Sequence, residues 1–160
     1  KGREQMEKKT VFEVANFFLS KESMSPKKLQ KLVYYAYAWT LAILNEDEIN
    51  IDYTLFDEPL QAWVHGPVCP DLYYRYKCYG WGEIPQCTFI HKHLFSVEEL
   101  DIMEQVWEVY GKFTGNELES ITHQEEPWIN AREGFQPYEP CQVNLDNKII
   151  FRYYNKQSAD

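Results

Sequence analysis

Hydrophobic residues recur along much of this chain at intervals of three and four positions, which is the spacing of one face of an α-helix. Residues 11–21 are the first example, and one side of the helix they predict carries Val11, Val14, Ala15 and Phe18. A second helix is predicted to begin at Pro26, because proline suits the first helical position and Ser25 before it is a good N-cap.

The helix that begins at Pro26 is apolar on nearly every side. Helical spacing relates Leu29, Leu32, Val33, Ala36, Thr40, Ile43 and Leu44. Much of the remaining circumference is filled by Tyr34, Tyr35, Trp39 and Leu41. Because a helix that is hydrophobic all round is a buried one, we expect this helix to be the central helix of the protein.

The pattern changes in the following segment. Short extended runs around Asp57–Pro59 predict a small β-hairpin or a bent strand within residues 50–64. Gly66-Pro67 is expected to end this structure. A helix over residues 71–80 follows, with Gly80 as its C-terminal stop.

Residues 95–113 give the clearest helix signal of the chain. Ser96 and Glu99 have the spacing of a capping box, in which each side chain bonds the backbone N–H of the other residue. One apolar stripe of this helix comprises Ile102, Val106, Val109 and Phe113. Thr114 is placed to cap a shorter helix over residues 116–123.

Two more helices are predicted near the end of the chain. Pro127 fits the first turn of one, which Gly134 closes. Residues 145–156 are predicted to form the other, although the β-rich run Ile149–Tyr154 leaves a strand as the alternative.

These elements predict a mainly α protein with a minor β part. We see no repeat, linker or low-complexity tract, so the sequence indicates one compact helical bundle around a central apolar helix. We expect this single domain to occupy residues 9–156. Residues 1–8 are interpreted as an N-terminal extension or as residues of cloning origin.

Composition favours a folded protein that binds other proteins. With 44% hydrophobic residues in 160, the chain has enough apolar area to fold. Its formal net charge of −9 disfavours binding along nucleic-acid phosphates, so we expect no direct nucleic-acid binding. Aromatic residues make up 16% of the chain, and part of that excess is expected on the surface, because Tyr and Trp suit protein interfaces.

Cysteine spacing and hydropathy bear on where the protein works. The four cysteines, Cys69, Cys78, Cys87 and Cys141, show no C-x-x-C spacing and are expected to be reduced. The sequence has no apolar run long enough to cross a bilayer and no signal-peptide pattern at its start. We therefore expect a cytoplasmic protein without a membrane span.

The sequence offers little catalytic chemistry. His123 and Glu125 fit the H-x-E of zinc deaminases, but Cys141 lacks the second cysteine of the P-C-x-x-C that completes the ligands. The preferred interpretation is a His–Glu pair that ties down the start of the helix at Pro127. We therefore expect no metal, no cofactor and no enzyme. A metal-dependent hydrolase that uses His65, His123 and Glu125 is the less favoured alternative.

Aromatic residues are densest between residues 62 and 85, where Gly66, Pro67 and Pro70 interrupt the chain. The rings there include Tyr73, Tyr74, Tyr76, Tyr79 and Trp81, too many for one buried helix stripe. One interpretation places one side in the core and leaves the other merely exposed; the functional interpretation is an anchor surface for a protein partner. By residue type and position, the candidate anchors are Trp63, Tyr74, Trp81 and Trp128.

Three blocks in this order, residues 28–42, 58–80 and 121–131, resemble the Panacea domain, the SocA-like antitoxin domain common in prophages and mobile elements. The positions that carry the resemblance are Leu29, Lys31, Leu32, Tyr34, Tyr35, Ala62, Trp63, Gly66, Pro67, Val68, Tyr73, Tyr76, Tyr79, Gly80, Thr122, His123, Pro127 and Trp128. We interpret most of these motif positions as structural.

The resemblance implies an antitoxin, encoded by a bacterium, phage or prophage, that binds and neutralises a protein toxin encoded beside it. An alternative implied by the same family is an adaptor that delivers the toxin to a host protease. Both agree with an acidic, aromatic-rich chain without a catalytic motif, and both predict a protein toxin as partner.

Overall fold

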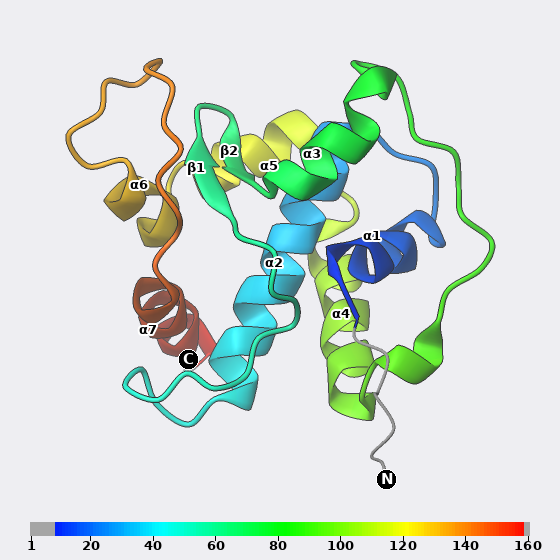
Figure 1. Ribbon diagram of the computed structural model, residues 1–160, viewed down its shortest axis with the longest axis horizontal. Coiled ribbons are helices and arrows are strands. Elements are labelled where there is room, and N and C mark those ends of the chain that lie inside the picture. Colours follow the sequence, from blue (N-terminus) through cyan, green and yellow to red (C-terminus); the bar gives the residue numbers. More distant parts are fainter. Residues whose placement is uncertain (1–8, 159–160) are drawn as a thin grey trace, which may run out of the picture.

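The computed structural model describes residues 9–158, so the extension expected at residues 1–8 lies outside the described residues. The described part is mainly helical with one small sheet, which confirms the predicted fold class (Figure 1). The elements are α1 (Val11–Leu19), α2 (Pro26–Leu44), β1 (Gln61–Trp63), β2 (Gly66–Val68), α3 (Pro70–Tyr76), α4 (Val97–Tyr110), α5 (Gly115–Thr122), α6 (Glu126–Ala131) and α7 (Asn147–Ser158).

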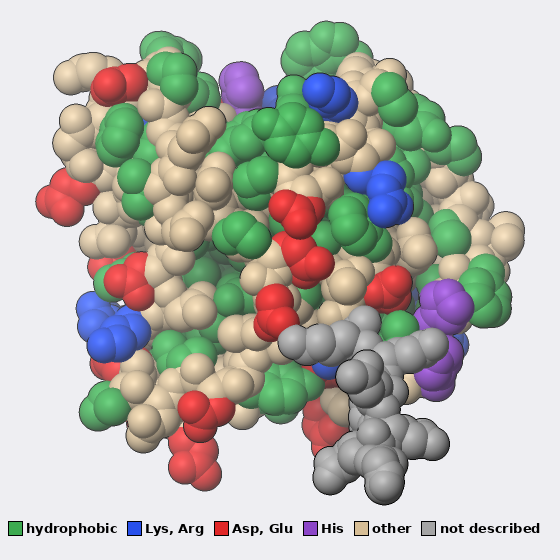
Figure 2. Space-filling model, viewed as in Figure 1, with side chains coloured by type: hydrophobic (Ala, Val, Ile, Leu, Met, Phe, Trp, Pro, Cys, Tyr) green, Lys and Arg blue, Asp and Glu red, His purple; other side chains and the backbone are tan. Residues whose placement is uncertain are grey.

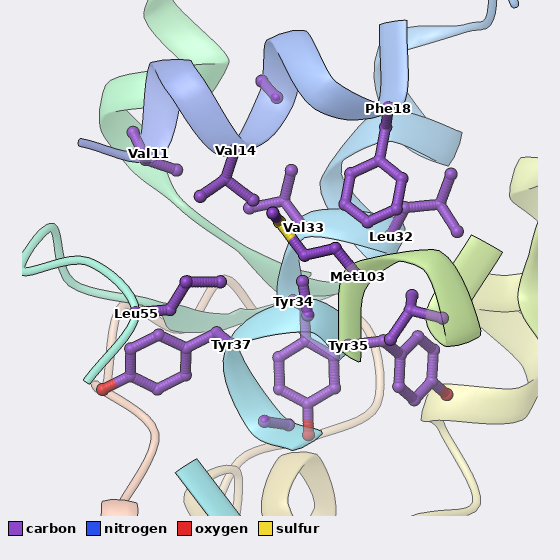
Figure 3. Close-up of a cluster of buried hydrophobic side chains, with 14 of the residues drawn as sticks. Val11, Val14, Phe18, Leu32, Val33, Tyr34, Tyr35, Tyr37, Leu55 and Met103 are labelled. Atoms are coloured by element: carbon purple, nitrogen blue, oxygen red, sulfur yellow. The ribbon is translucent and has the colours of Figure 1, made fainter. Parts of the chain in front are cut away.

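Helix α2 runs through the middle of the molecule, with α1 and α4 on one side and α7 on the other (Figure 1). Every residue from Leu29 to Ala38 is buried, as expected of a central helix. In the core, Leu32 and Val33 face Val14 of α1 and the Met103 side chain of α4 (Figure 3). Since α2 contacts α1, α4, α5 and α7, its burial holds the bundle together.

The buried tyrosines of α2 are tied to the rest of the core by hydroxyl hydrogen bonds. Glu125 Oε1 accepts from Tyr35 Oη at 2.9 Å and from Tyr154 Oη at 2.8 Å. Because Tyr154 uses its proton in this way, Tyr34 donates to Tyr154 Oη at 3.0 Å. Burial raises the pKa of Glu125, against the opposing effect of the two phenol donors. This network joins α2 to α7 and to the start of α6.

The β-hairpin lies later in the chain than predicted. The expected range of residues 50–64 contains only β1, and Gly66-Pro67, expected to end the structure, begins β2. Ala62 pairs with Pro67 but directs its N–H to Val143 O at 2.9 Å, away from β2. Pro67 therefore occupies a non-hydrogen-bonded position, where a strand does not need the N–H that proline lacks.

The predicted helices are confirmed, with small changes in where they begin and end. The capping boxes of α4, with Ser96 and Glu99, and of α5, with Thr114 and Glu117, are both formed. The last segment is helix α7, so the strand alternative was wrong.

Helix α3 starts at Pro70 rather than Asp71 and continues beyond Tyr76 as a 3-10 turn. Gly80 ends this turn at φ +55°, with its N–H bonded to Lys77 O. Gly80 is thus the C-terminal stop that the sequence predicted.

Two positions expected in apolar stripes are not buried. Ile43 is 50% exposed and Val109 is 54% exposed. Each lies in the last turn of its helix. Within residues 9–158 the structure contains no helix with the length and hydrophobicity that a bilayer span requires.

Candidate functional site

A groove of about 660 Å³ opens where the first turns of α2 and α5 meet the hairpin and α3. These elements lie together at the top of Figure 1. Its lining residues are Ser25, Pro26, Lys27, Leu29, Gln30, Trp63, His65, Val68, Leu72, Tyr73, Tyr76, Lys77, Gly80, Trp81, Thr114, Gly115 and Asn116. Helix α5 approaches α2 closely because Gly115 has no side chain: a Cβ there would lie 3.0 Å from Lys28 N.

Side chains of α2 hold the second strand of the hairpin. Gln30 pairs with the backbone of Cys69, accepting from its N–H at 2.9 Å and donating to its carbonyl at 3.1 Å. Lys31, one residue further on, donates from Nζ to Pro67 O at 3.1 Å. An isolated two-stranded hairpin is marginally stable in water, so these hydrogen bonds from the central helix help to hold the hairpin in place.

The first strand is held by side chains from α6 and its C-terminal end. Arg132 is buried and donates from Nη1 to Ala62 O at 3.0 Å. Trp128 donates from Nε1 to Trp63 O at 2.7 Å. Both edges of the hairpin are therefore fixed, and with them the direction in which Trp63 and His65 point.

Lys31 is an unusual group in this support. Its side chain is 1% exposed, and burial lowers its pKa to about 7, against the opposing charge of Glu119. Gly66 makes room for it: at φ +109°, a Cβ on Gly66 would lie 2.7 Å from Lys31 Cε and 3.0 Å from Thr122 Oγ1. Lys31, Gly66 and Thr122, three of the motif positions, thus meet at one point beneath the hairpin turn.

Beside the groove lies a polar hollow of about 520 Å³, which shares Lys27, His65 and Asn116 with it. Glu119 lies in the hollow and accepts from Lys27 Nζ at 2.6 Å, while His65 Nδ1 lies 2.9 Å from its other oxygen. Burial opposes ionisation of Glu119, but the hydrogen bonds with Lys27 and His65 hold its pKa below the ordinary value. His123 Nε2 lies 3.9 Å from the same carboxylate.

The surroundings of His123 favour its neutral form. Burial lowers its pKa, while the charge of Glu119 acts in the other direction. Its ring stacks on Trp128, with centroids 4.0 Å apart and an interplanar angle of 15°. We therefore regard His123 as a packing partner of Trp128 under the hairpin.

Aromatic rings continue from the hairpin onto α3. Trp63 meets Tyr73 edge to face at 5.0 Å, and Tyr73 meets Tyr74 at 5.5 Å. Trp81 stands at the far rim of the groove with 92% of its surface exposed. Figure 2 shows hydrophobic side chains gathered over α3, whereas acidic side chains spread over the middle and lower parts of that face.

The structure separates the four predicted anchors. Trp63 and Trp81 line the groove, and Tyr74 lies on the outer side of α3 with 64% of its surface exposed. Trp128 is half-buried behind the hairpin and does not line the groove. Exposure thus distinguishes Tyr74 and Trp81 from Trp63 and Trp128, which are both half-buried.

The three residues of the hydrolase alternative do not meet at one point: His65 and His123 both lie beside Glu119 in the polar hollow, but Glu125 does not. Glu125 turns into the core, where it accepts hydrogen bonds from Tyr35 and Tyr154. His123 stacks on Trp128 and does not pair with Glu125. The predicted His–Glu tie at the start of α6 is therefore wrong as well. Within residues 9–158, no three His, Cys, Asp or Glu side chains are grouped to hold a metal ion.

Sequence reasoning missed Lys27, Lys77 and Glu119 at this site. Glu119 stands one helical turn before His123, a spacing that places both on one face of α5 and could have shown the pair. Lys77 lies within the tyrosine-rich segment but was not singled out. Lys27 lies in the first turn of α2, and nothing local links it to α5.

The chain matches a known family model. The family described as antitoxin SocA-like, Panacea domain, matches residues 29–129, a range that begins in α2 and ends in α6 and contains the hairpin, α3 and α5. Neither curated proteins nor solved structures gave a match. The match covers well over half of the chain and includes most of the groove, and we conclude that the protein belongs to the SocA-like antitoxin family with the Panacea domain.

Proposed function

We propose that this chain is an antitoxin that neutralises a protein toxin by direct binding, through the aromatic face around the groove. Family membership indicates a role in a toxin–antitoxin system. The observation that carries the proposed mechanism is Trp81, which stands 92% exposed at the groove rim. Burying a side chain of 150–250 Å² at about 25 cal/mol per Å² gives roughly 4–6 kcal/mol of gross stabilisation to a complex.

The predicted anchors have different roles in this proposal. Trp81 and Tyr74 are exposed and available to a partner, whereas Trp63 forms a wall of the groove. Trp128 acts from behind, since its indole N–H holds the Trp63 carbonyl. Aromatic side chains lose little conformational entropy when they bind, which suits them to be anchors.

Co-expression with the protein encoded beside this chain tests the proposal. We expect growth arrest by that protein to be relieved by the wild type and restored by Trp81→Ala. The matched control is Tyr138→Ala, because Tyr138 is 86% exposed but lies outside the groove. Arrest that persists beside soluble wild-type protein would refute the proposal.

The amount of toxin distinguishes blocking from delivery to a protease. An immunoblot of the toxin during rescue is expected to show an unchanged level, because direct binding leaves the toxin intact. A toxin level that falls during rescue, and recovers in a strain that lacks the responsible protease, would replace blocking by delivery.

A further inference from the structure

The groove differs in charge from the protein around it. The chain contains twenty-five Asp and Glu against sixteen Lys and Arg. Among the described residues that line the groove there is no Asp or Glu, while Lys27, Lys77 and His65 are present. A carboxylate that approaches this protein is therefore repelled by most of the surface but not here.

The basic side chains of the groove are not equally available. Lys27 and His65 both engage Glu119 of the neighbouring hollow, and Lys27 also donates to Asn116 Oδ1 at 2.9 Å. Lys77 forms no ion pair with a described residue, and its Nζ lies 5.1 Å from the centre of the Tyr74 ring. Lys77 can therefore form an ion pair with a carboxylate of a partner without breaking an existing ion pair.

The walls of the groove are apolar and aromatic. Leu29, Val68 and Leu72 are buried at its floor, and Tyr73, Tyr76 and Trp81 stand around them. Gln30, the polar residue of the floor, already uses its amide on the backbone of Cys69. A partner side chain at the floor therefore needs no hydrogen-bonding group, and an apolar one fits best.

We propose that the groove receives a segment of the toxin in which an apolar or aromatic side chain stands next to one or more carboxylates. This inference rests on the proposed function and specifies the chemistry of the partner. The apolar side chain enters between Trp63, Tyr76 and Trp81, and the neighbouring carboxylate pairs with Lys77. The volume of about 660 Å³ lies within the range of pockets that enclose small ligands, so a few side chains fill it.

Charge also restricts where the segment can bind. An acidic segment placed elsewhere on a chain of net charge −9 meets like charge, so the groove gives specificity by excluding other positions. The attraction acts during the approach as well, and it weakens as salt screens the charges.

Calorimetry with the purified protein encoded beside this chain tests the inference. The variant is Lys77→Glu and the matched control is Lys112→Glu, which makes the same change of charge on an exposed lysine outside the groove. At 50 mM salt we expect Lys77→Glu to weaken binding about tenfold or more, and Lys112→Glu about twofold or less. The loss for Lys77→Glu should shrink at 300 mM salt.

Two outcomes separate this inference from the proposed function. If the wild type binds the toxin and relieves arrest while Lys77→Glu binds as tightly as Lys112→Glu, the groove inference is wrong and the antitoxin function stands. If the wild type neither binds nor relieves arrest, the antitoxin function is wrong, and the inference falls with it.

Peptides identify the segment directly. Overlapping 15-residue peptides of the same toxin, tested against the wild type, are expected to bind where Asp or Glu stands within a few residues of an aromatic or large aliphatic residue. Replacing that carboxylate by lysine in the toxin should restore binding to Lys77→Glu. Peptides rich in Lys or Arg that bind in preference to these would overturn the inference.

Discussion

Lys31 offers a direct test of how the hairpin is supported, because its burial should appear as a pH dependence of stability. The ordinary pKa of this group is 10.5, and burial lowers it to about 7 in the folded protein. The difference corresponds to about 5 kcal/mol of preference for the neutral amine in the folded state. A lysine with its Nζ in solvent contributes no such preference.

The direction of the effect follows from proton binding. Between pH 7 and pH 10.5 the unfolded chain keeps the proton on Lys31 while the folded protein has lost it, so stability rises with pH. Below pH 7 both states are protonated and the dependence disappears. Between pH 7 and pH 9, we expect the contribution of Lys31 to the free energy of unfolding to rise by about 2 kcal/mol.

Urea unfolding of the wild type and of Lys31→Met at pH 7, 8 and 9 measures this contribution. Methionine has a similar length and carries no proton, so the difference between the two proteins isolates Lys31 from other groups that titrate in this range. The control is Lys156→Met, in the exposed last turn of α7. We expect its difference from the wild type to stay constant over the three pH values.

The reasoning fails if the difference between the wild type and Lys31→Met changes by less than about 0.5 kcal/mol from pH 7 to pH 9, since burial of the amine predicts about four times as much. The absolute stability of Lys31→Met does not decide the matter. That variant also leaves Pro67 O without its donor, a pH-independent loss of about 1–3 kcal/mol.

Three further changes test the same architecture. Gly66→Ala should lower the free energy of unfolding by about 2–5 kcal/mol, because it adds a clash with Lys31 to the strain of positive φ. The control Gly134→Ala, at φ +91°, meets no atom within 4 Å and should lower it less. Equal losses would contradict the clash. The raised pKa of Glu125 contributes stability at low pH, and this contribution is lost as pH rises through the pKa of the folded state. Glu125→Gln should remove that part of the pH dependence of the free energy of unfolding. A pH profile in urea melts that stays unchanged would count against burial of the carboxylate. Arg132→Met should cost at least about 2 kcal/mol in the same melts, since it leaves the buried Ala62 carbonyl without its donor, and an unchanged midpoint would rule out that role.

The helices could be predicted because their signals are local. Ser96 and Thr114 form capping boxes with residues three positions further on, so the starts of α4 and α5 can be recognised from a short stretch of sequence. The ring of Pro26 favours the first helical position without help from any other residue. The central position of α2 was also readable, since its apolar circumference required burial on every side.

The hairpin could not be placed in this way. Whether Pro67 can lie in a strand depends on the register of β1 against β2, which leaves Ala62 and Pro67 as a non-hydrogen-bonded pair. The Ala62 N–H then needs an acceptor outside the hairpin, and it finds one in Val143, some eighty residues away in sequence. A proline after a glycine reads locally as the end of a structure. Only the partner strands show that this proline fills a position where no N–H is needed.

The candidate site was half predictable. Residue type pointed to Trp63 and Trp81, which do line the groove, but the same criterion also selected Trp128, which supports the hairpin from behind. Whether a tryptophan is exposed depends on packing between segments that are distant in the sequence, so the residues around it do not indicate its exposure. The role proposed for Lys77 depends on a groove lining that contains no described Asp or Glu, and only the folded chain reveals that lining.

The groove divides into parts that carry different constraints. Leu29, Val68, Tyr73 and Tyr76 are motif positions of the family resemblance, and they form its floor and inner wall, where any change disturbs the packing of α2 against the hairpin and α3. Lys27, Lys77 and Trp81 are not motif positions. Lys77 and Trp81 are exposed at the rim, where a substitution alters charge and shape at little cost to the fold, whereas Lys27 is held by its pair with Glu119. A scaffold built in this way can change its partner through the rim alone, and we therefore expect the choice of toxin to be determined there.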